Sequence, residues 1–417
     1  MKSKEKDLNK KKNRIMLKNT KGITLIALVI TIIVLIILAG VSISVLFNQD
    51  GIIAKARQAK SDYANAQNEE ATTIGSLISK IDEAEGGNNN PPEEIKKVSE
   101  VKGGSYFDKA TTLEDSNGNK IKVPQGFKIA EDSGINVTEG IVIEDNDIID
   151  GIGNNRGNQY VWVPVENGIK KSDGTTVDIT LGRYTFASDG TPTLQQNAEN
   201  YADEVLIKTF KELATSRTGV ASYKTDGLNT TALDLKGFID SVKANGGYYI
   251  ARYEASYGTD GKANSKISNS FTDSNTAKTR TEGMLWNYIT ELDAATASRG
   301  LYTTATTDLI NSYAWDTAIV YIQNFSGDTD YSIQNSKNTT LSNTGTNGDE
   351  VCKINDMASN VWEYTTEYST YTDRSFTYPC TRRGGVYSYS DEYASYRNDD
   401  NAIGSFENYA FRPTLYM

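Results

Sequence analysis

The most diagnostic segment of the chain reads Asn355-Asp356-Met357-Ala358-Ser359-Asn360-Val361-Trp362-Glu363-Tyr364-Thr365. It is preceded by Gly247-Tyr248-Tyr249-Ile250-Ala251-Arg252-Tyr253-Glu254 and followed by Arg383-Gly384-Gly385, and the chain closes with Ala410-Phe411-Arg412-Pro413 before its last residues. We expect most of these residues to be scaffold. Trp362 is expected to fill the core, and Gly384 and Gly385 to let strands approach closely. Glu363 and Arg412 are candidates for an internal ion pair, and Glu254 is best explained as structural.

In their order and spacing, these segments resemble motifs of the formylglycine-generating-enzyme-like superfamily, whose core is a C-type-lectin-like fold. That family typically reads "Asp-Met-x-Gly-Asn-Val-Trp-Glu-Trp" and "Arg-Gly-Gly-Ser", and closes with "Gly-Phe-Arg". The resemblance implies a C-type-lectin-like head over residues 101–417. Around the motifs, we expect strands at 159–165 and 248–254 and amphipathic helices at 233–244 and 313–324, with a polar insertion around 166–230. Strands and helices alternate without a regular βαβ rhythm, which predicts an α+β fold.

The residues that would carry catalysis in this superfamily are missing. Its oxidase members hold copper with two cysteines just after the Arg-Gly-Gly motif, and residues 386–412 contain no cysteine. Its iron-dependent relatives use histidine, and the chain has none. We therefore expect a protein that is not an enzyme, with no catalytic residues, no metal and no cofactor. The two cysteines, Cys352 and Cys380, either form one disulfide or remain as buried free thiols.

Recognition residues dominate the stretch between the Arg-Gly-Gly motif and the last strand. Tyrosine gives a large contact area with few rotatable bonds, and Ser, Asn and Asp supply adaptable hydrogen bonds. In lectin-like folds this region lines the exposed ligand face, although a solvated loop without a partner has the same composition. The expected ligand-binding residues are Tyr387, Tyr389, Asp391, Tyr393, Tyr396, Asn398, Asp399, Asn401, Asn408 and Tyr409.

The same stretch resembles the variable proteins of diversity-generating retroelements. Those proteins carry a lectin-like C-terminal domain whose hypervariable patch lies between Arg-Gly-Gly and Phe-Arg-Pro ends. In those proteins, mutations directed to the adenines of asparagine codons produce Tyr, Ser, Asp, Asn, Ala, Gly and Phe, the residue types found in this stretch. The resemblance implies a binding face that is diversified between copies of the gene.

The N-terminal region resembles a type IV prepilin. A basic leader (1–22) ends at Gly22 and is followed directly by Ile23, and no charged residue occurs from there until Asp50. The apolar run Ile23–Phe47 is about 37 Å long as a helix, enough to cross a bilayer, with its basic end in the cytoplasm. In the prepilin family a membrane peptidase cuts after the glycine, here between Gly22 and Ile23, and methylates the new N-terminus. Ala27 stands at the position where the family usually has a glutamate. The absence of this glutamate is more typical of minor subunits than of major pilins.

Helical spacing continues to about residue 85, which predicts one long transmembrane and assembly helix over 23–85. A Gly/Asn/Pro linker (86–100) then leads to the head. A plain signal anchor, a secretory signal peptide or a simple stalk are the alternatives for these segments. The expected partners are a prepilin peptidase and pilus or pseudopilus subunits, and the expected location is the cell membrane, with the head at the cell surface or on a pilus.

Charge excludes one further class of partner. The chain has a formal net charge of −11, and because the leader contributes +7, the rest is at −18. Such an acidic chain is not expected to bind nucleic acid. The sequence thus predicts a surface-displayed pilin or pseudopilin whose head acts in adhesion or ligand capture, with an external protein or glycan as ligand. A membrane-tethered enzyme with an unrecognised site, and a purely structural minor pilin, are the alternatives.

Overall fold

The computed structural model describes residues 95–147, 156–213, 232–258, 260–272, 280–373, 376–401 and 404–417. The contacts divide the chain into Met1–Glu93 and Glu94–Met417, and every described residue belongs to the second unit. The expected cleavage site at Gly22 and Ile23, the apolar run Ile23–Phe47, the helix to 85 and the linker up to residue 94 lie outside the described residues.

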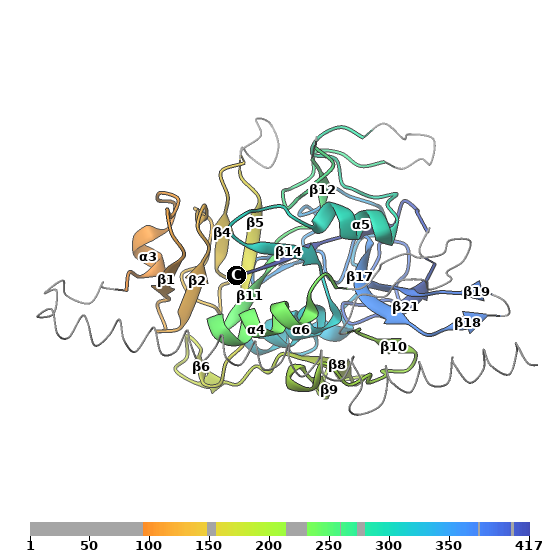
Figure 1. The fold of residues 1–417 in the computed structure, drawn as a ribbon, viewed down its shortest axis with the longest axis horizontal. Coiled ribbons are helices and arrows are strands. Elements are labelled where there is room, and N and C mark those ends of the chain that lie inside the picture. Colours follow the sequence, from red (N-terminus) through yellow and green to blue (C-terminus); the bar gives the residue numbers. More distant parts are fainter. Residues whose placement is uncertain are drawn as a thin grey trace, which may run out of the picture. The chain divides into compact units, whose positions relative to one another are not determined.

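A six-stranded antiparallel sheet forms the centre of the domain (Figure 1). Its two middle strands are continuous runs of buried residues, as expected for strands covered on both faces. The strand order is β14 (Thr306–Leu309), β23 (Pro413–Tyr416), β11 (Gly247–Ala251), β5 (Gln159–Pro164), β4 (Val142–Glu144) and β3 (Lys128–Ile129).

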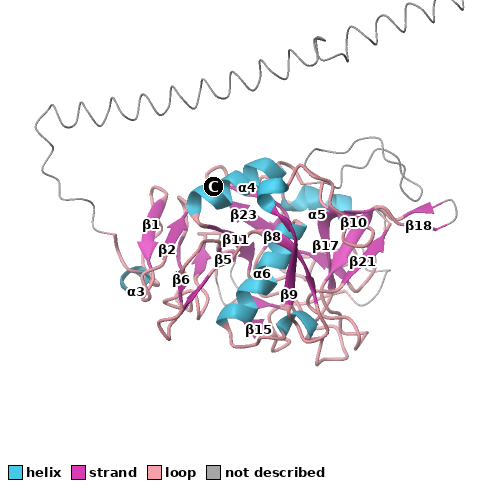
Figure 2. Cartoon of the chain, turned by 90° about the horizontal axis from the view of Figure 1, so that it is seen from below, coloured by secondary structure: helices cyan, strands magenta, loops and turns pink. Residues whose placement is uncertain are grey.

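A second sheet, of five strands, is built mostly from the C-terminal part of the chain. Its order is β10 (Phe210–Lys211), β17 (Trp362–Ser369), β20 (Cys380–Arg383) and β21 (Arg397–Asp400), and β22 (Tyr409–Phe411) pairs in parallel with β17. Since β22 ends at Phe411 and β23 begins at Pro413, the chain passes from the second sheet to the first at Arg412. Figures 1 and 2 place β17 and β21 at the opposite end of the domain from β1 (Thr111–Glu114) and β2 (Lys120–Val123).

The helices pack on these sheets and begin at capping side chains. Asn311 accepts a hydrogen bond from Ala314 N (2.9 Å) at the start of α6 (Ser312–Phe325), which contacts β5, β8 and β17. Asp234 caps α4 (Leu235–Asn245), which ends at Gly246 with φ 75° and packs on β11 and β23. The remaining helices are α3 (Val98–Val101), α5 (Glu291–Ser298) and the 3₁₀ turns Ala198–Asn200 and Tyr331–Ile333.

Several two-stranded pieces complete the domain. The hairpin of β8 (Gly182–Phe186) and β9 (Pro192–Asn197) packs on α6. It lies in the region expected to be a polar insertion, whose described part carries strands β6 to β10. The other pairs are β1 (Thr111–Glu114) with β2 (Lys120–Val123), β6 (Ile169–Lys170) with β7 (Thr176–Val177), β12 (Ser256–Tyr257) with β13 (Ala263–Asn264), β15 (Glu350–Val351) with β16 (Ile354–Asn355), and β18 (Thr372–Asp373) with β19 (Phe376–Thr377).

The predicted fold class, α+β with a long transmembrane helix and a C-type-lectin-like head, is wrong. Strands make up most of the regular secondary structure of the described residues, and α6 is their longest helix at 14 residues. Across these residues we find no helix with the length and apolar character that crossing a bilayer requires. The error has a physical origin. Apolar runs here are short and separated by Gly, Asn and Thr turns, so single strands of two to four residues leave little periodicity to detect.

Candidate functional site

The ten residues predicted to bind a ligand lie between β20 and the start of β22. Tyr389 and Asp391 are exposed and Tyr409 is buried, whereas the remaining seven are partly buried. Four of the ten belong to two distinct regions: Tyr389 and Tyr409 to a group of packed aromatic rings, and Tyr393 and Tyr396 to the wall of a cavity. The other six lie in neither region. The partly buried residues are Tyr387, Tyr393, Tyr396, Asn398, Asp399, Asn401 and Asn408.

Four aromatic rings form a continuous surface, here called the aromatic platform: Trp362, Tyr389, Phe406 and Tyr409. Tyr389 stacks on Trp362 with ring centroids 5.5 Å apart and planes 18° apart. Tyr409 packs against Trp362 at 5.4 Å, and Phe406 meets Tyr409 edge-on at 5.1 Å. Tyr389 and Phe406 are 50% and 51% exposed, while Trp362 is only 4% exposed. The platform therefore presents two open rings on a buried aromatic floor.

The register of the second sheet brings these distant residues together. Trp362 begins β17 and lies opposite Tyr409 of the parallel strand β22, and its N–H donates to the carbonyl of Asn408 (2.8 Å). On the other side, β20 places Arg382 opposite Tyr364, which shares a face with Trp362 because side chains alternate along a strand. The platform is thus fixed by regular strands rather than by loops alone.

Arg382 adds a positive charge beneath the platform. Its guanidinium carbon lies 3.4 Å from the centroid of the Trp362 ring, a cation–π contact. The closest carboxylate oxygen in an ion pair with it is that of Asp400, at 3.8 Å from Nε, and Asp400 also accepts a hydrogen bond from the Tyr409 hydroxyl. Burial raises the pKa of Asp400, which the Tyr409 hydroxyl and Arg382 oppose.

Three buried polar atoms around the platform lack a hydrogen-bond partner within the described residues. They are the indole nitrogen of Trp362, Nε of Arg382 and Oε2 of Glu392. Burial raises the pKa of Glu392, and the neighbouring Tyr396 and Trp362 side chains oppose this effect. The polar atoms of Glu392 and Trp362 are therefore neighbours, and they do not by themselves mark a ligand site.

The residues expected to be scaffold hold the floor of this region. The ion pair expected between Arg412 and Glu363 is present: Arg412 Nε donates to Glu363 Oε2 (2.6 Å), and both side chains are fully buried. Arg412 also donates to the carbonyls of Ala251 (3.2 Å) and Asn355 (2.9 Å). It thereby joins the ends of both sheets at the point where the chain crosses between them.

Backbone contacts fix the start of the Tyr/Ser/Asn/Asp-rich stretch 387–409, here called the recognition segment. Gly384 has φ 87°, and a Cβ on Gly385 would lie 2.0 Å from the carbonyl oxygen of Ala358. Neither position therefore accepts a side chain. Glu254 accepts hydrogen bonds from the Asn360 side chain (2.6 Å) and the Val361 N–H (3.1 Å), just ahead of Trp362. Burial, followed by nearby carboxylates, raises the pKa of Glu254 well above its ordinary value.

The second region is a cavity of about 160 Å³, here called the tyrosine cavity. It lies between β8, the Ile207–Lys208 turn and the recognition segment. Tyr393 and Tyr396 meet edge-on in its wall, with ring centroids 6.1 Å apart. Its main lining residues are Tyr184, Phe186, Lys208, Tyr393, Tyr396 and Arg397.

Arg397 lines the tyrosine cavity and was not among the residues predicted from the sequence. It lies in the middle of the recognition segment but donates to Glu367 (2.8 Å) and Asp316 (2.8 Å), both fully buried. Arg383 binds the same two carboxylates, and Arg183 binds Glu367. These three guanidinium groups lower the pKa of Glu367 to about 2, against the opposing effect of burial. The segment is therefore anchored at Arg397 and open on either side of it.

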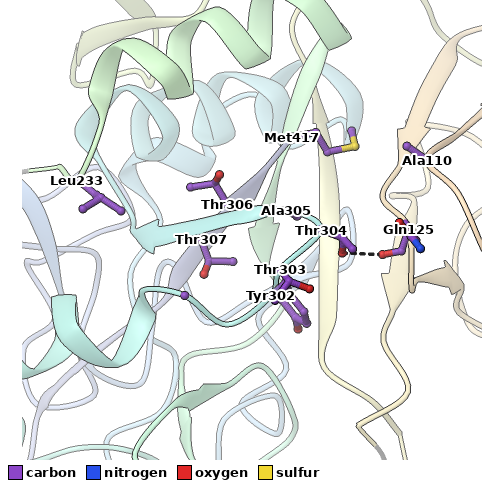
Figure 3. Close-up of a pocket in the computed structure, with 11 residues that line it drawn as sticks. Ala110, Gln125, Leu233, Tyr302, Thr303, Thr304, Ala305, Thr306, Thr307 and Met417 are labelled. Atoms are coloured by element: carbon purple, nitrogen blue, oxygen red, sulfur yellow. Dashed lines mark hydrogen bonds between the residues drawn. The ribbon is translucent and has the colours of Figure 1, made fainter.

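A larger groove of about 610 Å³ lies elsewhere, along β14 (Figure 3). Its wall is made of uncharged residues, among them Tyr302, Thr306, Thr307 and Met417, and Thr304 donates to the Gln125 carbonyl across it (2.9 Å). None of the ten predicted residues lines it. Size alone does not make it the better candidate, because it lacks the charged groups that orient a ligand.

The cysteines give no support to a redox or metal site. Cys352 and Cys380 are buried free thiols, so the disulfide alternative is wrong; they belong to different core clusters. Burial raises the pKa of the Cys352 thiol to about 12. Within the described ranges, no three His, Cys, Asp or Glu side chains are placed to share a metal ion.

Comparison with known proteins leaves the chain without relatives to argue from. No protein-family model matches it, and no curated protein matches its sequence. The resemblances to prepilins, to the formylglycine-generating-enzyme-like superfamily, to lectins and to retroelement-diversified proteins thus find no support in these comparisons. The functional argument has to come from the geometry of the site.

Proposed function

We propose that the domain over residues 95–417 is a ligand-binding module displayed at the cell surface, with the aromatic platform as its contact surface. The observation that carries the proposal is the half-exposed Tyr389 stacked on the buried Trp362 above Arg382. Tyrosine, tryptophan and arginine are the residue types that most often dominate binding energy at interfaces. An exposed ring already held by stacking loses little freedom on binding, so its contact with a ligand is pre-organised.

Two further features support a binding role. Charged side chains stand beside the rings, since Arg382 contacts Trp362 and Asp400 pairs with Arg382. The recognition segment is rich in Tyr, Ser, Asn and Asp, which combine rigid contact area with adaptable hydrogen bonding. An external protein or glycan fits this chemistry. An acidic chain of this composition disfavours nucleic acid.

The proposal is tested by a binding screen with the full chain. Immobilised glycans and extracted cell-surface proteins are the probes, and bound chain is detected with an antibody. Probes that retain the wild type are then tested with Tyr389→Ala/Phe406→Ala and with Tyr371→Ala. Tyr371 is a matched control, because it is 42% exposed and pairs with Tyr378 away from the platform. Loss of binding in the platform variant alone supports the proposal.

A further inference from the structure

The tyrosine cavity is a second candidate binding site, and its size and lining differ from those of the aromatic platform. Its volume of about 160 Å³ is below the range of roughly 300–1,000 Å³ typical of drug-sized ligands. It therefore suits one ring or one terminal group rather than a chain. Aromatic rings come from both sides, Tyr184 and Phe186 from β8 and Tyr393 and Tyr396 from the recognition segment.

Lys208 stands at this cavity in a backbone conformation that lysine rarely adopts. It is the first central residue of a two-residue turn, closed by hydrogen bonds between Ile207 and Phe210 (2.8 and 3.0 Å). Its φ is 59°, where glycine is the favoured residue. Backbone strain of this kind is enriched at ligand-binding and active sites. Lys208 is exposed, and none of the described carboxylates forms an ion pair with its ammonium group.

The charged residues that line the cavity are both cations. They are Lys208 and Arg397, and no carboxylate is among its lining residues. The Arg397 guanidinium is held by the buried carboxylates of Asp316 and Glu367, which lie behind the cavity wall. An anion in the cavity would therefore meet favourable charge without a carboxylate in the lining to repel it.

We propose that the tyrosine cavity binds the carboxylate-bearing ring of an acidic sugar, with Lys208 contacting the carboxylate and the tyrosine rings flanking the sugar. The lining favours a sugar over an acidic peptide side chain, because four aromatic rings offer more flat surface than a single carboxylate stem can cover. The inference deepens the proposed function. It rests on it only in taking the recognition segment as the binding face, since no platform residue lines the cavity.

The test is calorimetric titration of the full chain with glucuronic acid and N-acetylneuraminic acid at millimolar concentration. Glucose serves as the neutral control, and N-acetylaspartate amide as the peptide-like control. The variant Lys208→Gly removes the cation and also relieves the left-handed strain, so it is expected to fold at least as well as the wild type. Because a hydrogen bond to a charged group is lost, affinity for the acidic sugars should fall at least about tenfold. Lys208→Arg should restore most of it.

The outcomes separate this inference from the proposed function. Tyr389→Ala/Phe406→Ala should leave acidic-sugar binding unchanged, because neither side chain lines the cavity. Equal affinity for glucose, or unaltered affinity in Lys208→Gly, would overturn the inference. Tighter binding of N-acetylaspartate amide would overturn the choice of a sugar, and absence of any binding would overturn the site. None of these results bears on whether the platform variant loses its attachment.

Discussion

Tyr389 covers Trp362: the two rings stack with planes 18° apart, and the residue expected to fill the core is buried partly by a residue of the binding surface itself. Trp362 belongs to the smaller apolar cluster at the second sheet, not to the main core around β5 and β11. One residue of the pair is thus expected to stabilise the fold and the other to contact a ligand. Substitutions of the two residues should therefore have different effects.

Truncation of Trp362 and truncation of Tyr389 should differ sharply in cost. Trp362→Ala is expected to lower the free energy of unfolding by about 3–5 kcal/mol, because it empties a buried site. Tyr389→Ala should cost only about 0.5–1.5 kcal/mol, the value of one aromatic pair. Urea unfolding followed by circular dichroism measures both. An equal loss of unfolding free energy in the two variants would contradict the assignment of Trp362 as the buried ring and Tyr389 as the exposed one.

The Arg412–Glu363 pair should behave as a structural lock. Arg412→Met leaves the fully buried Glu363 without its partner and is expected to cost about 3–5 kcal/mol. Replacing both residues together, as Arg412→Met/Glu363→Leu, should cost clearly less than the single change, although the hydrogen bonds to Ala251 and Asn355 are also lost. If the double variant is as unstable as the single one, the lost stability comes from the hydrogen bonds to those two carbonyls and not from the unpaired Glu363. The same unfolding assay applies.

Stability should fall as the pH rises from about 4.5 to about 7. Burial raises the pKa of Glu212 from 4.5 to about 7 and that of Asp349 from 3.8 to about 6. Because these folded-state pKa values lie above the unfolded ones, the native state binds more protons in this window, and its stability is lost as the pH rises through them. For Glu212 alone the change amounts to roughly 3 kcal/mol.

Glu212→Gln mimics the protonated carboxyl and isolates this effect. In the wild type, Glu212 accepts hydrogen bonds from Ser312 and Thr366. The variant should show a flatter stability profile between about pH 4.5 and pH 7, the interval between the ordinary pKa of Glu212 and its pKa in the folded protein. Below this window the profile should turn, since the pKa of Glu367 is lowered to about 2 and its stabilisation disappears in acid. An unchanged slope in Glu212→Gln would contradict the assignment.

Both cysteines should be unreactive in the folded protein. Cys352 and Cys380 are buried, and burial raises the pKa of each thiol, which suppresses the reactive thiolate. Titration with a chromogenic disulfide reagent should detect no thiol in native protein and two after denaturation. Two thiols that react at once in the native state, or none after denaturation, would show that the packing or the redox state differs.

The sequence predicted local elements better than their assembly. The strands expected at 159–165 and 248–254 and the helices at 233–244 and 313–324 correspond to β5, β11, α4 and α6. Those segments have long apolar patterns or clear caps. The fold class was wrong because the many short strands carry no such pattern, and the pairing of β17 with β22 depends on contacts distant in the sequence.

The binding role of the recognition segment stays a prediction, made from its Tyr/Asn/Asp-rich composition. The structure adds that Tyr389 is exposed and Tyr409 is buried. Composition could not separate Arg397 from its neighbours, since its burial depends on Asp316, 81 positions away. Nothing in the sequence distinguishes Lys208 from other lysines, because the feature that sets it apart is its positive backbone φ.

The most direct test of the binding proposal compares Tyr389→Ala/Phe406→Ala with Tyr371→Ala for attachment to a probe that binds the wild type. Affinity and melting temperature are measured on the same preparations. We predict that the platform variant loses attachment while its melting temperature falls only slightly, and that Tyr371→Ala matches the wild type in both. A platform variant that binds as tightly as the wild type would contradict the account, and so would a control variant that loses binding to the same extent.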